Sequence, residues 1–224
     1  MKLDYTHITL VLDRSGSMDS MRGDAIGGFN TFLKDQQSAP GSATLTLVQF
    51  DDRYEKPHEF TPLPSVEPLS EKTFVPRGST ALLDAVGQAI DETGSRLATL
   101  PENARPAKVL FVTLTDGMEN ASHKFSRQQI FEKITHQRDI YGWDFVFLAA
   151  NQDAIATGAT MGFTAESSAT YAATGKGQQS ALKAVSQATA KYRSANPAAP
   201  AFAERKRSFF DAEDRAVIEE GNAE

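Results

Sequence analysis

The sequence predicts an α/β fold: a Rossmann-like, doubly wound, mostly parallel central sheet with one antiparallel edge strand and helices on both faces. The first observation is a set of four short, nearly continuous apolar runs, the pattern of strands buried on both sides of a sheet. The second is that apolar residues recur at helical spacing between these runs, and strand–helix alternation is typical of parallel sheets. The four predicted strands are Ile8–Leu12, Thr44–Phe50, Val109–Leu114 and Phe145–Ala149.

A first helix is predicted between the first two strands. Asp19 and Ser20 can cap its start with their side-chain oxygens. The Gly27–Gly28 pair is costly inside a helix, so we expect the helix backbone to pack closely on the sheet there. The apolar residues at helical spacing are Ala25, Phe29, Phe32 and Leu33.

The segment after the second strand predicts one edge of the sheet. A turn at Asp51–Arg53 leads into a strand at Tyr54–Phe60, and Pro57 removes a hydrogen-bond donor from that strand. Since proline is confined to sheet edges, we expect this strand to be the antiparallel edge strand. A surface loop then runs from Pro62 to Gly78.

The rest of the chain continues the alternation. In the helix at residues 126–138 we expect Ile130, Phe131 and Ile134 to face the sheet. The other predicted elements are a helix from Ala81 to near Pro101, a short helix at 153–160, a last edge strand at Thr170–Ala173 and a final helix at 178–192.

The amino-acid composition argues against nucleic acid and membrane as partners. The 224 residues are 40% hydrophobic and 23% charged, with a net charge of −6 and only one short basic group, Arg205–Arg207. Phosphate binding depends on clustered Lys and Arg, so we expect no nucleic-acid partner.

No apolar run reaches the length of a membrane-spanning helix, and the N-terminus lacks the pattern of a secretory signal. We therefore expect a cytoplasmic protein without a membrane partner; its oligomeric state cannot be read from the sequence.

We expect one domain and a tail. Residues 1–193 carry the alternating pattern, whereas residues 194–224 begin with the linker-like run Asn196-Pro-Ala-Ala-Pro. The tail then has a mixed-charge, helix-compatible segment that contains Phe209, Phe210, Val217 and Ile218. These apolar side chains either pack on the same domain or form a short docking helix for another protein.

Oxygen-bearing side chains follow two of the predicted strands. Asp13, Ser15 and Ser17 come directly after the first strand, and Asp116 follows the strand at Val109–Leu114. Because the carboxyl ends of parallel strands share one edge of a sheet, these side chains converge if the two strands are neighbours. Hard oxygen donors suit Mg²⁺, Mn²⁺ or Ca²⁺, and the chain has no cysteine that would favour a softer metal.

Three short motifs together resemble a known site. The D-x-S-x-S of Asp13, Ser15 and Ser17, the threonine of GSTALLDAV at Thr80, and the aspartate of TLTDG at Asp116 are similar to the metal-ion-dependent adhesion site, or MIDAS, of von Willebrand factor A (VWA) domains. The resemblance covers residues 6–192, includes all five positions of that motif, and is closest to the bacterial and phage intracellular members. It implies that these five residues hold a divalent cation. Mg²⁺ is the ion we expect first, and Mn²⁺ and Ca²⁺ are the alternatives.

The resemblance also implies a function. Only two of the five ligands are carboxylates, so a bound cation would keep positive charge and an open coordination position. In the family this position takes an Asp or Glu of a partner protein, which implies a non-enzymatic, metal-dependent protein-binding module with no catalytic residues. We expect Ser15 and Thr80 to lie at a solvent-facing rim of this site.

Other interpretations of the same residues remain. Each motif alone could be a helix cap or a turn, and Asn120 could either support the site or cap a helix. The alternative function is a metal-dependent phosphotransferase or hydrolase that uses the same cation. That chemistry usually needs a base or nucleophile, and the four histidines are scattered without metal-ligand spacing. They are His7, His58, His123 and His136.

Overall fold

The first apolar run forms the central strand of the fold, β1. The protein is described by a computed structural model that covers residues 1–150, 153–199, 202 and 208–223. Its strands are β1 (Lys2–Asp13), β2 (Ser42–Phe50), β3 (Tyr54–Pro62), β4 (Pro106–Thr115), β5 (Asp144–Ala150) and β6 (Ser168–Tyr171). Its α-helices are α1 (Arg22–Ser38), α2 (Leu82–Thr99), α3 (Arg127–Tyr141), α4 (Ala154–Thr160), α5 (Gly175–Ser194) and α7 (Ala212–Asn222). Short 3-10 helices are η1 (Gly16–Met21), η2 (Leu63–Ser65), η3 (Glu102–Ala104) and η4 (Ala165–Ser167).

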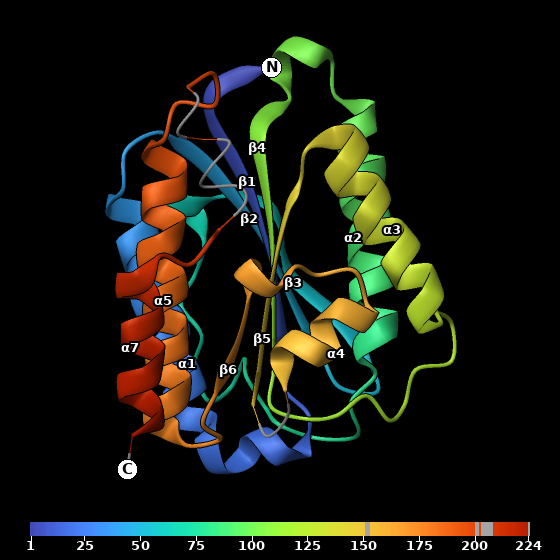
Figure 1. Ribbon diagram of the computed structural model, residues 1–224, viewed down its shortest axis with the longest axis vertical. Coiled ribbons are helices and arrows are strands. Elements are labelled where there is room, and N and C mark those ends of the chain that lie inside the picture. The colour runs from blue at the N-terminus through green and yellow to red at the C-terminus, as the bar shows by residue number, and fades with distance from the viewer. Residues whose placement is uncertain (151–152, 200–201, 203–207, 224) are drawn as a thin grey trace.

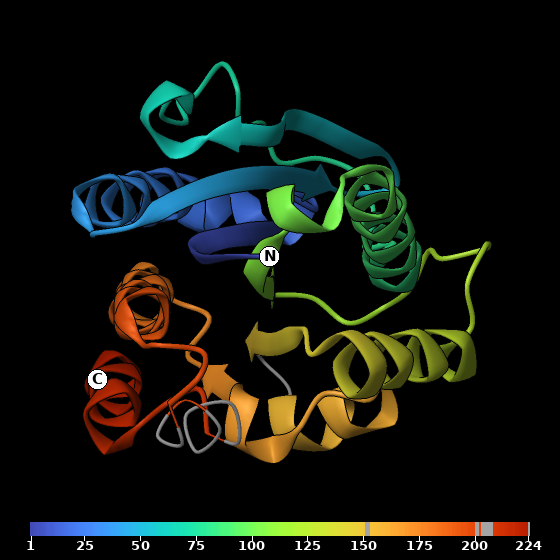
Figure 2. The same ribbon diagram turned by 90° about the horizontal axis from the view of Figure 1, so that it is seen from above.

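The described strands form one six-stranded sheet in the order β3-β2-β1-β4-β5-β6. β3 pairs with β2 antiparallel, and every other pairing is parallel. Helices α1, α5 and α7 lie on one side of the sheet and α2, α3 and α4 on the other (Figures 1 and 2). The predicted fold class, with its single antiparallel edge strand, is therefore confirmed.

The two faces of the sheet bury separate apolar clusters. One cluster packs the sheet against α1 and α5, and the other packs it against α2 and α3. In β1, Leu10 and Leu12 belong to the first cluster and Val11 to the second, so successive side chains enter opposite cores. This double burial explains why the parallel strands are apolar at nearly every position.

Because β1 lies between β2 and β4, the carboxyl ends of these three strands meet at one edge of the sheet. Connections from this edge diverge: the chain leaves β1 toward α1 on one face, and it leaves β4 toward α3 on the other face (Figure 2). Ligands of open parallel sheets bind where neighbouring connections separate in this way. The topology thus brings the ends of β1 and β4 together, as the placement of Asp13 and Asp116 requires.

The start of α1 differs from the prediction. Asp19 and Ser20 lie within η1, and α1 begins at Arg22 without a side-chain cap. The chain forms the 3-10 turn first because it buries Met18 and Met21 in the core between the sheet and α1. Tertiary packing therefore overrides the local capping signal.

Two further details of helix packing also differ. Phe131 is 40% exposed, whereas Ile130 and Ile134 are buried. One residue turns a helix by about 100°, so Phe131 falls outside the stripe that faces the sheet. A Cβ added to Gly28 would lie 2.5 Å from Leu182 Cδ1, so the glycine permits a close approach of α1 to α5 rather than to the sheet.

The tail packs on the domain. Phe209, Phe210 and Ile218 are buried in the core cluster that contains α5. Asn222 extends this contact to the sheet edge, where its Oδ1 accepts from the Ala172 N–H and its Nδ2 donates to the Thr170 carbonyl. The side-chain amide thus pairs with backbone groups just at and beyond β6, which protects a free edge. The basic group at 205–207 lies outside the described residues.

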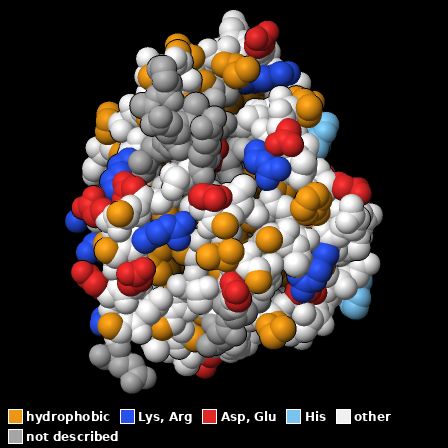
Figure 3. All heavy atoms as spheres, viewed as in Figure 1, with side chains coloured by type: hydrophobic (Ala, Val, Ile, Leu, Met, Phe, Trp, Pro, Cys, Tyr) orange, Lys and Arg blue, Asp and Glu red, His pale blue; other side chains and the backbone are white. Residues whose placement is uncertain are grey.

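Charges of both signs are interspersed on the face of the molecule in Figure 3, without a broad basic surface. None of the described helices is long and apolar enough to span a membrane.

A buried lysine holds the end of α5. Lys108 in β4 donates from Nζ to the carbonyls of Arg193 at 2.5 Å and Ala195 at 2.6 Å, and burial lowers its pKa. We expect Lys108→Met to destabilise the fold by about 2–4 kcal/mol, because it leaves these carbonyls without a donor. Chemical denaturation at neutral pH measures this change.

Lys133→Met is the matched control for that measurement. Lys133 forms a surface ion pair with Asp91, so its loss is expected to cost no more than about 1 kcal/mol. Equal effects of the two substitutions would contradict the role given to Lys108.

Candidate metal site

Asp13 ends β1 inside the protein. Its Oδ2 accepts from Thr115 Oγ1 at 2.5 Å, and its Oδ1 accepts from the Ser15 N–H at 2.7 Å. Burial raises the pKa of Asp13 to about 6, against the opposing effect of these hydrogen bonds, and the nearby charge of Asp116 adds to the increase. Burial of the ionised Asp13 carboxylate at this strand end therefore lowers the stability of the fold.

Two serines connect Asp13 with Asp116. Ser15 Oγ lies 3.1 Å from Ser17 Oγ, and Ser17 Oγ donates to Asp116 Oδ1 at 2.8 Å. Asp116 is buried, and burial raises its pKa as well. Residues about a hundred positions apart in the sequence are thus joined by a short chain of hydrogen bonds.

Thr80 reaches the same place from the third loop. A Cβ added to Gly117 would lie 2.9 Å from Thr80 Oγ1 and 3.7 Å from Ser17 Oγ. Glycine at 117 therefore leaves room for both hydroxyls beside Asp116. The structure brings all five predicted residues together. Three unrelated turns would have no reason to converge in this way.

The expectation that Ser15 and Thr80 lie at a solvent-facing rim is wrong. Ser15 and Thr80 are buried, and Ser17 is exposed. The reason is that two loops cover Ser15 and Thr80: the Gly16 N–H donates to the Gly78 carbonyl at 3.1 Å. Gly78 has a φ of +66°, a conformation that glycine adopts without strain.

Asn120 holds the backbone of Thr80. Its side-chain Oδ1 accepts from the Thr80 N–H at 2.9 Å, and its own N–H donates to the Thr80 carbonyl at 3.1 Å. Glu119 holds the backbone at the start of α2 in a similar way, because its Oε2 accepts from the Leu83 N–H at 2.9 Å. Asn120 therefore contacts the backbone of a predicted site residue, whereas the next helix, α3, is capped by Ser126.

A buried ion-pair network fastens two of the loops, and sequence reasoning missed it. Asp51 Oδ2 accepts from Arg14 Nε at 3.0 Å and from Arg77 Nε at 2.9 Å. Both arginines also pair with Glu55, and the Arg77 N–H donates to the Arg14 carbonyl. The only sequence signal was an arginine inside the D-x-S-x-S motif, which by itself does not identify its partners.

The five side chains fit a divalent cation. Two carboxylates and three hydroxyls are hard oxygen donors, the type that Mg²⁺, Mn²⁺ and Ca²⁺ prefer. Within the described residues, neither Asp13 nor Asp116 forms an ion pair with Lys, Arg or His, so two buried negative charges lack a cationic side-chain partner. A doubly charged cation would balance them.

In the part of the chain that the structure describes, no three or more His, Cys, Asp or Glu side chains are grouped so that they could hold a metal ion. The candidate site instead combines two carboxylates with three hydroxyls. The histidines do not form an alternative: His7 is buried in the sheet, with its ring against Phe60.

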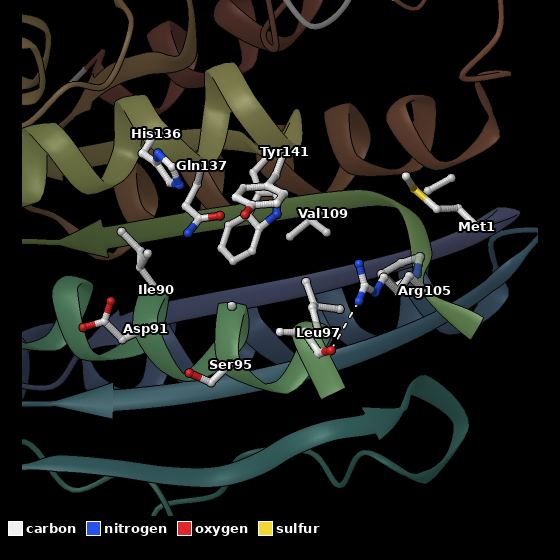
Figure 4. A pocket seen from close by; sticks show the side chains of 15 residues that line it. Met1, Ile90, Asp91, Ser95, Leu97, Arg105, Val109, His136, Gln137 and Tyr141 are labelled. Atoms are coloured by element: carbon white, nitrogen blue, oxygen red, sulfur yellow. Dashed lines mark hydrogen bonds between the residues drawn. The ribbon is translucent and has the colours of Figure 1, made fainter. Parts of the chain in front are cut away.

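A separate cavity lies near the opposite end of the sheet. A space of about 820 Å³ separates α2 from α3 near the start of β4, lined by Trp143, Gln137 and Arg105 among others (Figure 4). It adjoins the amino ends of β4 and β5, whereas the five candidate ligands lie at the carboxyl ends. The cavity is therefore separate from the candidate metal site.

Comparison with known proteins supports the fold. No protein-family model and no curated protein sequence matches the chain. The solved vWF domain of the type V pili tip protein Mfa5 from Porphyromonas gingivalis aligns with a TM-score of 0.57 and 10% identity, over 82% of this chain and 94% of that domain.

Two other solved structures align over a similar share of this chain. They are proximal thread matrix protein 1 from the mussel byssus, with a TM-score of 0.56, 16% identity and coverage of 83% of this chain and 46% of that one, and a von Willebrand factor type A protein from Catenulispora acidiphila, with a TM-score of 0.53, 13% identity and coverage of 84% and 42%. The chain spans less than half of these two proteins. Its described residues have the fold of a von Willebrand factor A domain.

Proposed function

We propose that the chain is a metal-dependent protein-binding module of the MIDAS type. A divalent cation, Mg²⁺ before Mn²⁺ or Ca²⁺, is held by Asp13, Ser15, Ser17, Thr80 and Asp116, and it ligates an Asp or Glu of a partner protein. The observation that carries the proposal is the convergence of these five side chains from three loops onto one edge of the sheet.

The donor set favours an external carboxylate. Three of the five groups are neutral hydroxyls, so the cation would keep a tendency to attract negative charge. Ser17 is the exposed member of the set, which supports access from solvent on its side. The module needs no base or nucleophile, because it binds its partner without changing a covalent bond.

A calorimetric titration tests the proposal. Mg²⁺ and Mn²⁺ are titrated into the wild type and into Asp116→Ala, and binding of short peptides with a single Glu is then measured with the metal and with a chelator. We expect the wild type to bind metal, and to bind the Glu peptides only when the metal is present. Metal binding that supports turnover of a phosphate ester, or peptide binding that survives chelation, would contradict the proposal.

The ion-pair network is expected to tune the metal affinity without contacting the metal. Asp51→Asn weakens the hold of Arg14 and Arg77, which connect the Ser15 loop to the segment that leads to Thr80. Supporting residues of metal sites typically contribute about 10–100-fold in affinity, so we expect a loss of that order for Mg²⁺ by calorimetry.

Asp91→Asn serves as the control for that variant. It removes an acidic side chain from a surface ion pair with Lys133, far from the five candidate ligands in the fold. An unchanged Mg²⁺ affinity in Asp51→Asn would show that the network does not position the ligands.

A further inference from the structure

An exposed methionine closely follows one of the candidate metal ligands in the chain. Met118 follows Asp116 by two residues and is 68% exposed. Ile155, on the neighbouring helix α4, is 45% exposed. Single exposed apolar residues are common on protein surfaces, so exposure by itself indicates little. The space next to Met118 provides the second observation.

A hollow of about 280 Å³ opens next to Met118. Leu82 and Met118 line one part of it, and Ala156 and Thr157 of α4 line another. Leu82 comes two residues after Thr80, just as Met118 comes two residues after Asp116. Two residues that line the hollow therefore stand two positions from proposed metal ligands in different loops.

The size of the hollow favours a single side chain. Pockets that enclose whole small-molecule ligands usually have roughly 300–1,000 Å³, so this hollow lies at the small end of that range, where one large side chain fits. The carboxylate of Glu119, which also lines the hollow, already accepts from the Leu83 N–H and the Ala121 N–H. Its hydrogen-bonding capacity is used inside the protein, so the occupant need not supply donors.

The charge beside the hollow favours an acidic partner. Arg127 lines the hollow, and its Nη1 donates to Thr160 Oγ1 at 3.3 Å. Among the described residues it has no acidic partner, so its positive charge remains available to a negatively charged segment. A cation at the neighbouring site would attract the same segment.

We propose that this hollow is a specificity pocket for a large apolar side chain of the partner protein. The inference rests on the proposed function: the partner segment presents its Asp or Glu to the cation and inserts a Leu, Met or Phe next to Met118. Asp116 and Met118 are two residues apart, and an extended chain advances about 3.3–3.6 Å per residue. The apolar residue therefore stands about two positions from the acidic one.

Selection from a library of short random peptides tests the pocket. The full chain is the target, with Mg²⁺ in one arm and chelator in the other. We expect the Mg²⁺-dependent peptides to share an Asp or Glu and a large apolar residue at that spacing. Replacing the apolar residue with Ser in a selected peptide should weaken binding at least about tenfold, the loss expected when one buried side chain is removed.

Two variants of the protein complete the test. Met118→Ser should weaken the selected peptide to a similar extent and leave the Mg²⁺ affinity unchanged, since Met118 is not a proposed ligand. Ile140→Ser is the matched control, because Ile140 is 65% exposed on α3 and does not line the hollow.

The outcomes separate the two proposals. Peptides that need Mg²⁺ and an acidic residue but tolerate Ser at the apolar position would overturn the pocket and leave the metal-dependent function intact. Peptides that bind equally in chelator would overturn the proposed function itself. Equal losses in Met118→Ser and Ile140→Ser would also overturn the pocket.

Discussion

Asp13→Asn is expected to change metal-free and metal-bound stability in opposite directions. Burial raises the pKa of Asp13 to about 6, so at pH 7.5 the metal-free protein carries a carboxylate in an unfavourable place. The neutral amide can accept from the Ser15 N–H and donate to Thr115 Oγ1, which then donates to the Gly117 carbonyl. We therefore expect the variant to melt at a higher temperature than the wild type in chelator.

Mg²⁺ should reverse this order. At a Mg²⁺ concentration about a hundred times the dissociation constant, binding stabilises the wild type by about 2.7 kcal/mol. For a chain of this length that is a rise of about 5–10 °C in the melting temperature. Asp13→Asn removes a charged ligand, so the rise should vanish. Thermal unfolding in chelator and in Mg²⁺ measures both effects, and a full Mg²⁺-induced rise in the variant would exclude Asp13 as a ligand.

The pH dependence of the metal-free wild type gives an independent check. A pKa that is raised in the folded state means that the native protein binds a proton more readily than the unfolded chain. The contribution of Asp13 to stability therefore increases as the pH falls through about 6 toward its ordinary value of 3.8. This local gain should be absent from Asp13→Asn.

His7 is expected to make the protein sensitive to acid. Burial lowers the pKa of His7 to about 3. The neutral ring lies 2.9 Å from Thr44 Oγ1 through Nδ1 and 3.2 Å from Thr9 Oγ1 through Nε2, and it stacks on Phe60 at 3.7 Å. Above pH 6.5 both the folded and unfolded states hold the ring neutral, so His7 imposes no penalty there.

Below pH 6.5 the unfolded chain takes up a proton that the folded protein excludes. The free energy of unfolding is then expected to fall by about 1.4 kcal/mol per pH unit on account of His7, down to about pH 3. Urea denaturation in chelator between pH 8 and pH 4.5 measures the slope.

Two variants isolate the contribution of His7 from that of the acidic residues. His7→Gln should be less stable than the wild type at pH 8, because the stacking on Phe60 is lost, but it should lack the loss of stability that His7 causes below pH 6.5. His123→Gln changes an exposed side chain and should keep the wild-type slope. Parallel pH profiles for the wild type and His7→Gln would contradict the assignment.

The sequence by itself determined the fold class and the identity of the five converging residues. Buried parallel strands must be apolar on both faces, so the four runs were visible without coordinates, and Pro57 marked the antiparallel edge. Asp13 and Asp116 stood at the ends of two such strands, and parallel topology places those ends together.

Tertiary structure decided what surrounds these residues. The contacts of Arg14 with Asp51 and of Asn120 with Thr80 join segments about forty positions apart, and no local pattern specifies such pairs. Burial of Ser15 and Thr80 follows from loops that fold over them, and the exposure of Phe131 follows from the rotation of α3 against the sheet. Periodicity reports which face of a segment is apolar, whereas the partner of each polar side chain depends on how distant segments pack.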